Sequence, residues 1–92
     1  MASDASVRNV DDLRQFGQNL MHSSENLVKL FQQLSRQMKH VSEGWNDTKN
    51  QAFMADFERK TIEINKLSQE MQVYAQFISK TCDLLDQYKS IR

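Results

Sequence analysis

Proline is absent from this 92-residue chain, and glycine occurs only twice, at Gly17 and Gly44. Because these two residue types interrupt helices most often, almost the whole chain is free to be helical. The single cysteine, Cys82, excludes an intramolecular disulfide framework. Twelve basic and twelve acidic residues cancel, so the net charge gives no reason to expect nucleic acid or an anionic membrane as a partner.

Long hydrophobic runs are also missing. No apolar stretch approaches the roughly 18 residues that a membrane-spanning helix needs, so we predict no membrane insertion. The first eight residues lack the basic start and apolar stretch of a secretory signal peptide. The sequence therefore predicts a protein that is cytoplasmic at synthesis, and any export would follow a route independent of a signal peptide.

Apolar side chains recur at steps of three and four residues on both sides of Gly44. The first ladder consists of Leu13, Phe16, Leu20, Leu27, Phe31, Leu34, Met38, Val41 and Trp45. The second consists of Phe53, Phe57, Ile64, Leu67, Met71, Tyr74, Ile78, Leu85 and Tyr88. Ser24, Lys60 and Thr81 occupy positions where the rhythm calls for an apolar residue. A period near 3.5 over about four heptads predicts two long helices that pack lengthwise.

We therefore predict one all-α domain, an antiparallel two-helix hairpin that covers residues 1–92. The expected parts are a flexible N-terminus at 1–9, a helix over about 10–43, a turn at 44–47 and a helix over about 48–89.

Capping residues support these boundaries. Asn9 is a plausible N-cap of the first helix, and Asn46 or Asp47 of the second. Gly44 is expected just after the first helix, in a left-handed conformation. Gly17 inside the first helix costs about 1 kcal/mol relative to alanine. Its small size would let a neighbouring backbone or bulky ring approach closely there.

The ladders hold more apolar surface than a two-helix seam needs. The predicted hairpin core is Phe31, Leu34, Met38, Phe53, Phe57, Ile64 and Leu67. A second group stands beside it on the second helix, namely Val73, Phe77, Leu84 and Ile91. These four residues are either ordinary exposed side chains or the interface for a second partner. An apolar face wider than one partner covers favours the interface, and with it a dimeric four-helix bundle. The partner would be a second copy or a similar helical hairpin protein.

The sequence has few residues in arrangements that could bind a metal or a phosphate or catalyse a reaction. His22, His40 and Cys82 do not have the spacing of zinc ligands, and two glycines cannot form a phosphate-binding loop. No glutamate precedes either histidine by three residues, as di-iron bundles require. We predict no metal, no cofactor, no small-molecule substrate and no enzymatic activity.

The turn resembles that of the Trp-x-Gly (WXG-type) hairpin family, the early-secreted-antigen-like proteins associated with type VII secretion. In that family a Trp-x-Gly turn joins two helices, and an aromatic residue follows eight positions after the tryptophan. Here Trp45 lies at mid-length and Phe53 follows it by eight. Asp47 stands where the family has glycine, and Asp can still cap the second helix. The family's export signal is a tyrosine followed four residues later by an acidic residue, whereas Tyr88 is followed at that distance by Arg92.

The resemblance implies a non-enzymatic protein–protein interaction module of a bacterial secretion-associated assembly. Trp45 would either pack the end of the hairpin or present a recognition feature to partners. An alternative is an intracellular structural subunit or chaperone that uses the hairpin as a coiled-coil element. A needle-like polymer ranks last, because such proteins usually turn through a proline-containing loop.

Overall fold

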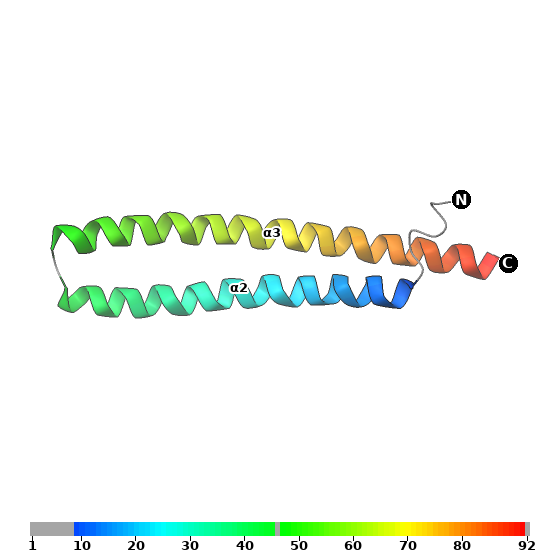
Figure 1. Cartoon of the computed structure of the whole chain (residues 1–92), viewed down its shortest axis with the longest axis horizontal. Coiled ribbons are helices and arrows are strands. Elements are labelled where there is room, and N and C mark those ends of the chain that lie inside the picture. Colours follow the sequence, from blue (N-terminus) through cyan, green and yellow to red (C-terminus); the bar gives the residue numbers. More distant parts are fainter. Residues whose placement is uncertain (1–8, 46, 92) are drawn as a thin grey trace.

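A computed structural model of the chain describes residues 9–45 and 47–91, and within them it consists of two helices. Helix α2 spans Val10–Gly44 and helix α3 spans Thr48–Ile91. They run antiparallel, side by side, and join through a short turn at one end of the molecule (Figure 1). The result is a rod with extents of 68 × 20 × 15 Å. The predicted all-α hairpin is confirmed, and α3 extends two residues beyond its predicted end.

Both helices begin at a side-chain cap. The Asp12 N–H donates to Asn9 Oδ1 at 3.1 Å, and the Asn50 N–H donates to Asp47 Oδ1 at 2.9 Å. These bonds satisfy backbone donors that the first turn of a helix leaves without an internal partner. The predicted cap at Asn9 is confirmed, and Asp47 rather than Asn46 is the cap that the structure describes, since Asn46 lies outside the described residues.

The prediction for Gly44 was wrong. Gly44 is the last residue of α2, and no described residue has a positive φ angle. The cap is Trp45, which is extended at φ −131° and ψ 93° and whose N–H donates to the Ser42 carbonyl at 3.3 Å. The Asn50 side chain donates to the Trp45 carbonyl. Because α3 supplies this donor, the helix end needs no left-handed glycine.

Three contacts set the register between the helices. Cys82 Sγ lies 3.8 Å from the Val10 carbonyl oxygen, Ser68 Oγ donates to the Ser24 carbonyl at 2.9 Å, and Ser42 Oγ donates to Asn50 Oδ1 at 3.1 Å. Each step toward the N-terminus along α2 therefore matches one step toward the C-terminus along α3.

The seam between the helices is built from small residues. The buried ones are Val10, Gly17 and Ser24 on α2, and Asn50, Ser68, Ala75 and Cys82 on α3. The predicted core residues Phe53 and Leu67 are 52% and 45% exposed in the single chain, so their assignment to the hairpin core was wrong. The buried seam position beside Leu67 is the next residue, Ser68. Small side chains let the two backbones approach closely, and larger neighbours are displaced to the side.

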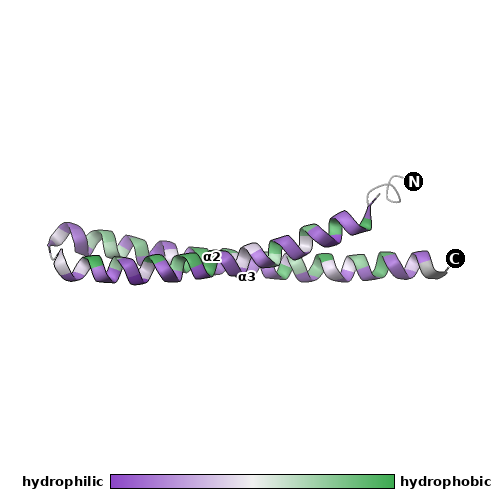
Figure 2. Cartoon of the chain, turned by 90° about the horizontal axis from the view of Figure 1, so that it is seen from below, coloured by the Kyte–Doolittle hydropathy of each residue, from purple (hydrophilic) through white to green (hydrophobic). Residues whose placement is uncertain are grey.

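Helix α3 is longer than α2 and projects beyond it. Because Val10 lies beside Cys82, the nine residues after Cys82 extend past the start of α2 by roughly 13 Å, at 1.5 Å per residue. Figure 1 shows this projecting end in red, and Figure 2 shows the helices crossing at a shallow angle. Of the described residues, only those of α3 form the open end of the hairpin.

Candidate interaction face

The hairpin buries almost no large apolar side chain of its own. Among the described residues, the buried hydrophobic side chains are those of Val10, Ala75 and Cys82. The largest side chains that are buried completely are those of Cys82, Ser24 and Ser68. Yet 39% of the sequence is hydrophobic, and green apolar positions recur along the length of both helices in Figure 2. The apolar content of the chain is therefore largely at its surface.

Most of this exposed surface lies on one side. Each residue turns a helix by about 100°, so Phe16 and Leu67 lie about 100° from the buried Gly17 and Ser68 that follow them. In an antiparallel pair that meets along one seam, equal offsets from the seam bring residues of the two helices to the same side. Tyr74, just before the buried Ala75, has the same offset.

We call this side the apolar face. Its exposed members are Phe16, Leu30 and Val41 on α2, and Phe53, Leu67, Tyr74 and Tyr88 on α3. Its half-buried members, nearer the seam, are Leu13, Leu20, Leu27, Leu34, Phe57, Ile64, Met71, Ile78 and Leu85.

The predicted interface residues do not all share this face. Phe77 and Leu84 are exposed and stand at its outer edge on α3. Val73 is equally exposed, but its position two residues before Ala75 directs it to the back of α3, away from the face. Ile91 ends α3, and its side chain lies outside the described residues.

The remaining predicted core residues lie between the seam and the face. The rings of Phe31 and Phe57 stack with centroids 6.1 Å apart and an interplanar angle of 28°. Leu34, Met38 and Ile64 are half-buried. These side chains have neighbours across the hairpin and still retain exposed surface.

The sequence contains a signal that separates seam from face. Gly17 and Ser24 are seven residues apart, and Ser68, Ala75 and Cys82 follow the same interval. Small residues at heptad spacing on both helices mark a close helix–helix seam. The larger residues one position before them, including Leu67 and Tyr74, then belong to a different face.

A polar cluster closes the turn end. Asp47 uses both carboxylate oxygens, since Oδ1 caps α3 through the Asn50 N–H and Oδ2 accepts from the Trp45 indole Nε1 at 3.0 Å. Ser42 donates to Asn50, whose amide holds the Trp45 carbonyl. The Trp45 ring is thereby held in a defined orientation while 37% of the residue stays exposed. Packing of the hairpin end and presentation to partners stay the two predicted roles for Trp45.

An ion-pair cluster closes the other end. Arg14 contacts Asp83 at 3.2 Å and Asp86 at 2.6 Å across the seam. The hydrogen bond that Arg14 donates to Asp83 raises the pKa of Arg14, burial opposes the shift, and Asp86 adds to it. Because the guanidinium is charged at any physiological pH, this cluster acts as a constant tie between the helices.

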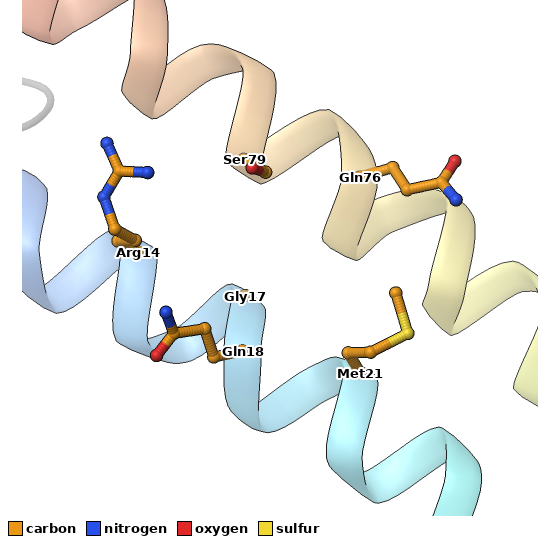
Figure 3. Close-up of a pocket in the computed structure, with 6 residues that line it drawn as sticks. All are labelled: Arg14, Gly17, Gln18, Met21, Gln76 and Ser79. Carbon is orange, nitrogen blue, oxygen red and sulfur yellow. The ribbon is translucent and has the colours of Figure 1, made fainter.

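A cavity of about 300 Å³ lies beside this tie, lined by Arg14, Gly17, Gln18, Met21, Gln76 and Ser79. Figure 3 shows it between the two helices, next to the glycine. The charged residue in its lining, Arg14, is already paired with Asp83 and Asp86. The lining of the cavity therefore offers no free charge for a ligand.

The two histidines and the cysteine, which were the possible metal ligands in the sequence, are far apart. His22 and His40 are exposed and each lies beside a glutamate of its own helix, Glu25 at 3.8 Å and Glu43 at 3.7 Å. Cys82 is buried in the seam. Within residues 9–45 and 47–91, no three metal-ligating side chains come together. In the same part of the chain, neither helix has an apolar stretch sufficient to cross a bilayer.

These features define a class, a helical hairpin closed by polar ties at both ends and apolar on one face. A comparison with known families finds no matching family model, and comparisons with curated proteins and with solved structures find no match either. The resemblance to the Trp-x-Gly family therefore rests on Trp45, Phe53 and the hairpin architecture alone.

Proposed function

We propose that this protein is a non-enzymatic interaction module that packs its apolar face onto a second helical hairpin and so forms a four-helix bundle. The partner is another copy or a similar hairpin protein. The observation that carries the proposal is that, among the described residues, no hydrophobic side chain larger than that of Val10 is buried. The chain has apolar surface for a core but lacks the second layer that would complete one.

The size of the face supports this proposal. Nine large side chains on the face and its outer edge are about half exposed, and with side chains of 150–250 Å² they present roughly 900 Å². A specific protein interface buries about 800 Å² on each partner, whereas soluble monomers rarely expose apolar patches above a few hundred Å². The exposed area is therefore of the size that one partner of the same dimensions covers.

The way the hairpin is closed also supports it. Small residues fill the seam, and the two ends are tied by Asp47 and by Arg14. A hairpin that is already ordered loses less conformational entropy when it binds, which favours association. The hairpin would dock as one unit rather than open to exchange helices.

The resemblance of the turn to the Trp-x-Gly family suggests a secretion-associated bacterial assembly as the setting. Position 92, four residues after Tyr88, is arginine rather than the acidic residue of the family's export signal. That difference favours the second setting, an intracellular structural subunit or chaperone of a larger assembly. Immunodetection in separated cells and culture medium distinguishes the two settings.

Site-specific photo-crosslinking tests the interaction itself. A benzophenone amino acid replaces Tyr74 on the apolar face, and the full-length protein is irradiated in cells that make it. We expect an adduct whose mass spectrum identifies a helical hairpin chain, either this one or another. Tyr74 suits the experiment because it is 64% exposed and aromatic, so the replacement disturbs the hairpin seam little.

The matched control carries the same amino acid at Ile62, which is 59% exposed but follows Thr61 on the opposite side of the seam. We expect no specific adduct from this position. Equal adducts from both positions, or none from Tyr74, would contradict the proposal that the apolar face is the binding surface.

A further inference from the structure

We propose that the apolar face is covered by a second copy of this chain, with both turns at the same end of the bundle. Helix α3 of each copy then lies antiparallel along α2 of the other. This inference rests on the proposed function and adds to it the identity and orientation of the partner. Three features of the described residues support it.

The first feature is the match of apolar residues at equal height. The register set by Val10 with Cys82 and by Ser24 with Ser68 gives the height of every residue along the rod. When the turns coincide, face residues of α2 meet face residues of α3 in the other copy at nearly the same height. The expected layers are Leu27 with Leu67, Leu20 with Tyr74, Val41 with Phe53, Phe16 with Ile78, and Leu30 with Ile64.

These layers have the geometry of an antiparallel coiled coil. Phe16, Leu20, Leu27 and Leu30 follow steps of four, seven and three. On α3 the steps alternate between three and four, at Ile64, Leu67, Met71, Tyr74 and Ile78. Each layer joins an exposed large side chain to a half-buried or exposed one, as knobs-into-holes packing requires. One symmetric arrangement thus covers most of the face.

The second feature is charge. Asp56, Glu63 and Glu70 form an exposed acidic row along the outer edge of the face, seven residues apart on α3. With the turns at the same end, Glu63 lies at a height between Asn26 and Gln33 of the second copy, and Glu70 at a height between Asn19 and Asn26. Acidic side chains then meet neutral polar ones, and no like charges oppose each other along this edge.

The opposite orientation brings like charges together. When the turns lie at opposite ends and the two hairpins overlap fully, the symmetric arrangement places α3 of one copy along α3 of the other. The acidic row of one copy then faces the acidic row of the other. At the central register Glu63 faces Glu70 of the other copy, and the symmetry repeats this contact. A shift of one heptad pairs Glu63 with Glu63, or Glu70 with Glu70. Like charges opposed across an interface disfavour that pairing.

The third feature is the projecting end of α3. Leu84 and Tyr88 extend past the start of α2, and both are exposed. With both turns at one end, the two projecting segments emerge together at the other end and can pack on each other. With the turns at opposite ends, each segment would project alone beyond the turn of the other copy.

Distance measurement between spin labels tests the proposal on the full-length protein. Cys82 is replaced by serine, and Lys49→Cys places one nitroxide per chain beside the turn. For two turns at the same end we expect a distance of roughly 20–35 Å, set by the bundle width. For turns at opposite ends the distance is roughly 50 Å, the length of α2 at 1.5 Å per residue.

Light scattering on the labelled sample gives the mass, and circular dichroism confirms that the variant is helical. A mass near twice 10.8 kDa with the short distance supports the proposal. A dimer with the long distance overturns the orientation, and a monomer at every concentration overturns the self-partner. Neither result contradicts the proposed function, because photo-crosslinking from Tyr74 tests that proposal separately.

A second variant checks the charge argument and does not depend on the label. Glu63→Gln with Glu70→Gln should change the dimer dissociation constant less than about threefold, because neither side chain opposes a like charge. A dimer that becomes tenfold tighter would overturn the orientation, since it would show that the acidic rows repel each other.

Discussion

Ser68 donates its hydroxyl to the backbone carbonyl of Ser24 at 2.9 Å, and both side chains are buried at the middle of the hairpin. The Ser24 hydroxyl in turn donates to the Met21 carbonyl at 2.7 Å. A hydroxyl can reach the backbone of a neighbouring helix only where the two helices approach closely. This contact explains why the large apolar residues lie beside the seam instead of within it.

Enlarging Ser68 should separate the helices. Ser68→Leu adds a side chain where the Ser24 backbone is in contact, and we expect a loss of about 1–3 kcal/mol in the free energy of unfolding from overpacking. Ser68→Ala, which loses only the hydrogen bond, should cost about 0.5–1.5 kcal/mol. Urea unfolding at one fixed chain concentration compares the two, because association also stabilises the fold. An equal or smaller loss for leucine would show that the seam is not closely packed.

Gly17 and Gly44 should respond oppositely to alanine. A Cβ atom at Gly17 would lie 2.8 Å from Ile78 Cγ2 and 3.3 Å from its Cβ, so Gly17→Ala forces a stiff β-branched side chain to move. We expect the overpacking penalty to exceed the gain of about 1 kcal/mol in helix propensity and to lower the melting temperature.

Gly44→Ala is the matched control. No atom lies within 4 Å of the Cβ position at Gly44, and its φ is not positive. Alanine there should stabilise by about 0.5–1 kcal/mol through reduced freedom of the unfolded chain. Thermal unfolding of the two variants side by side measures the difference. A lower melting temperature for Gly44→Ala would mean that the turn needs glycine after all.

Asp47 should combine two separable roles. Asp47→Asn retains the oxygen that caps α3 but replaces the acceptor for the Trp45 indole, so helix stability should stay close to the parent. Asp47→Ala removes both interactions and should cost about 1 kcal/mol from the lost cap.

Fluorescence of Trp45, the only tryptophan, reports the second role. Both variants should show greater quenching by acrylamide than the parent, and only the alanine variant should unfold at a lower urea concentration. Unchanged quenching in Asp47→Asn would show that the indole is held by packing rather than by its hydrogen bond.

Arg14 should govern the opening of the helix ends. Arg14→Gln removes the ion pairs to Asp83 and Asp86, and amide exchange should become faster over the first two turns of α2 and the facing part of α3. Exchange at the turn end should not change. Arg59→Gln is the control, because Arg59 pairs with Asp56 within one helix and ties nothing across the seam. Faster exchange throughout the molecule would contradict a local role for Arg14.

Much of the hairpin could be predicted from local pattern. The absence of proline, the three-and-four rhythm and the caps at Asn9 and Asp47 act within one helix or one turn, and both helices were placed to within about two residues at their ends. The turn geometry was less accessible. Gly44 was expected to end the first helix in a left-handed conformation. Instead, the side-chain amide of Asn50, six residues later, donates a hydrogen bond to the Trp45 carbonyl.

The sequence by itself determined that two long amphipathic helices form and fold back at Trp45, because hydrophobic periodicity and capping are local properties. Only the tertiary structure decided which of two adjacent stripes on each helix meets the other helix. Leu67 and Ser68 differ by one position, and hydrophobicity favours Leu67 for the seam. The close approach of backbones at Gly17, Ser24 and Ser68 favours the small stripe, because it leaves no room for leucine, and so Leu67 lies on the exposed face.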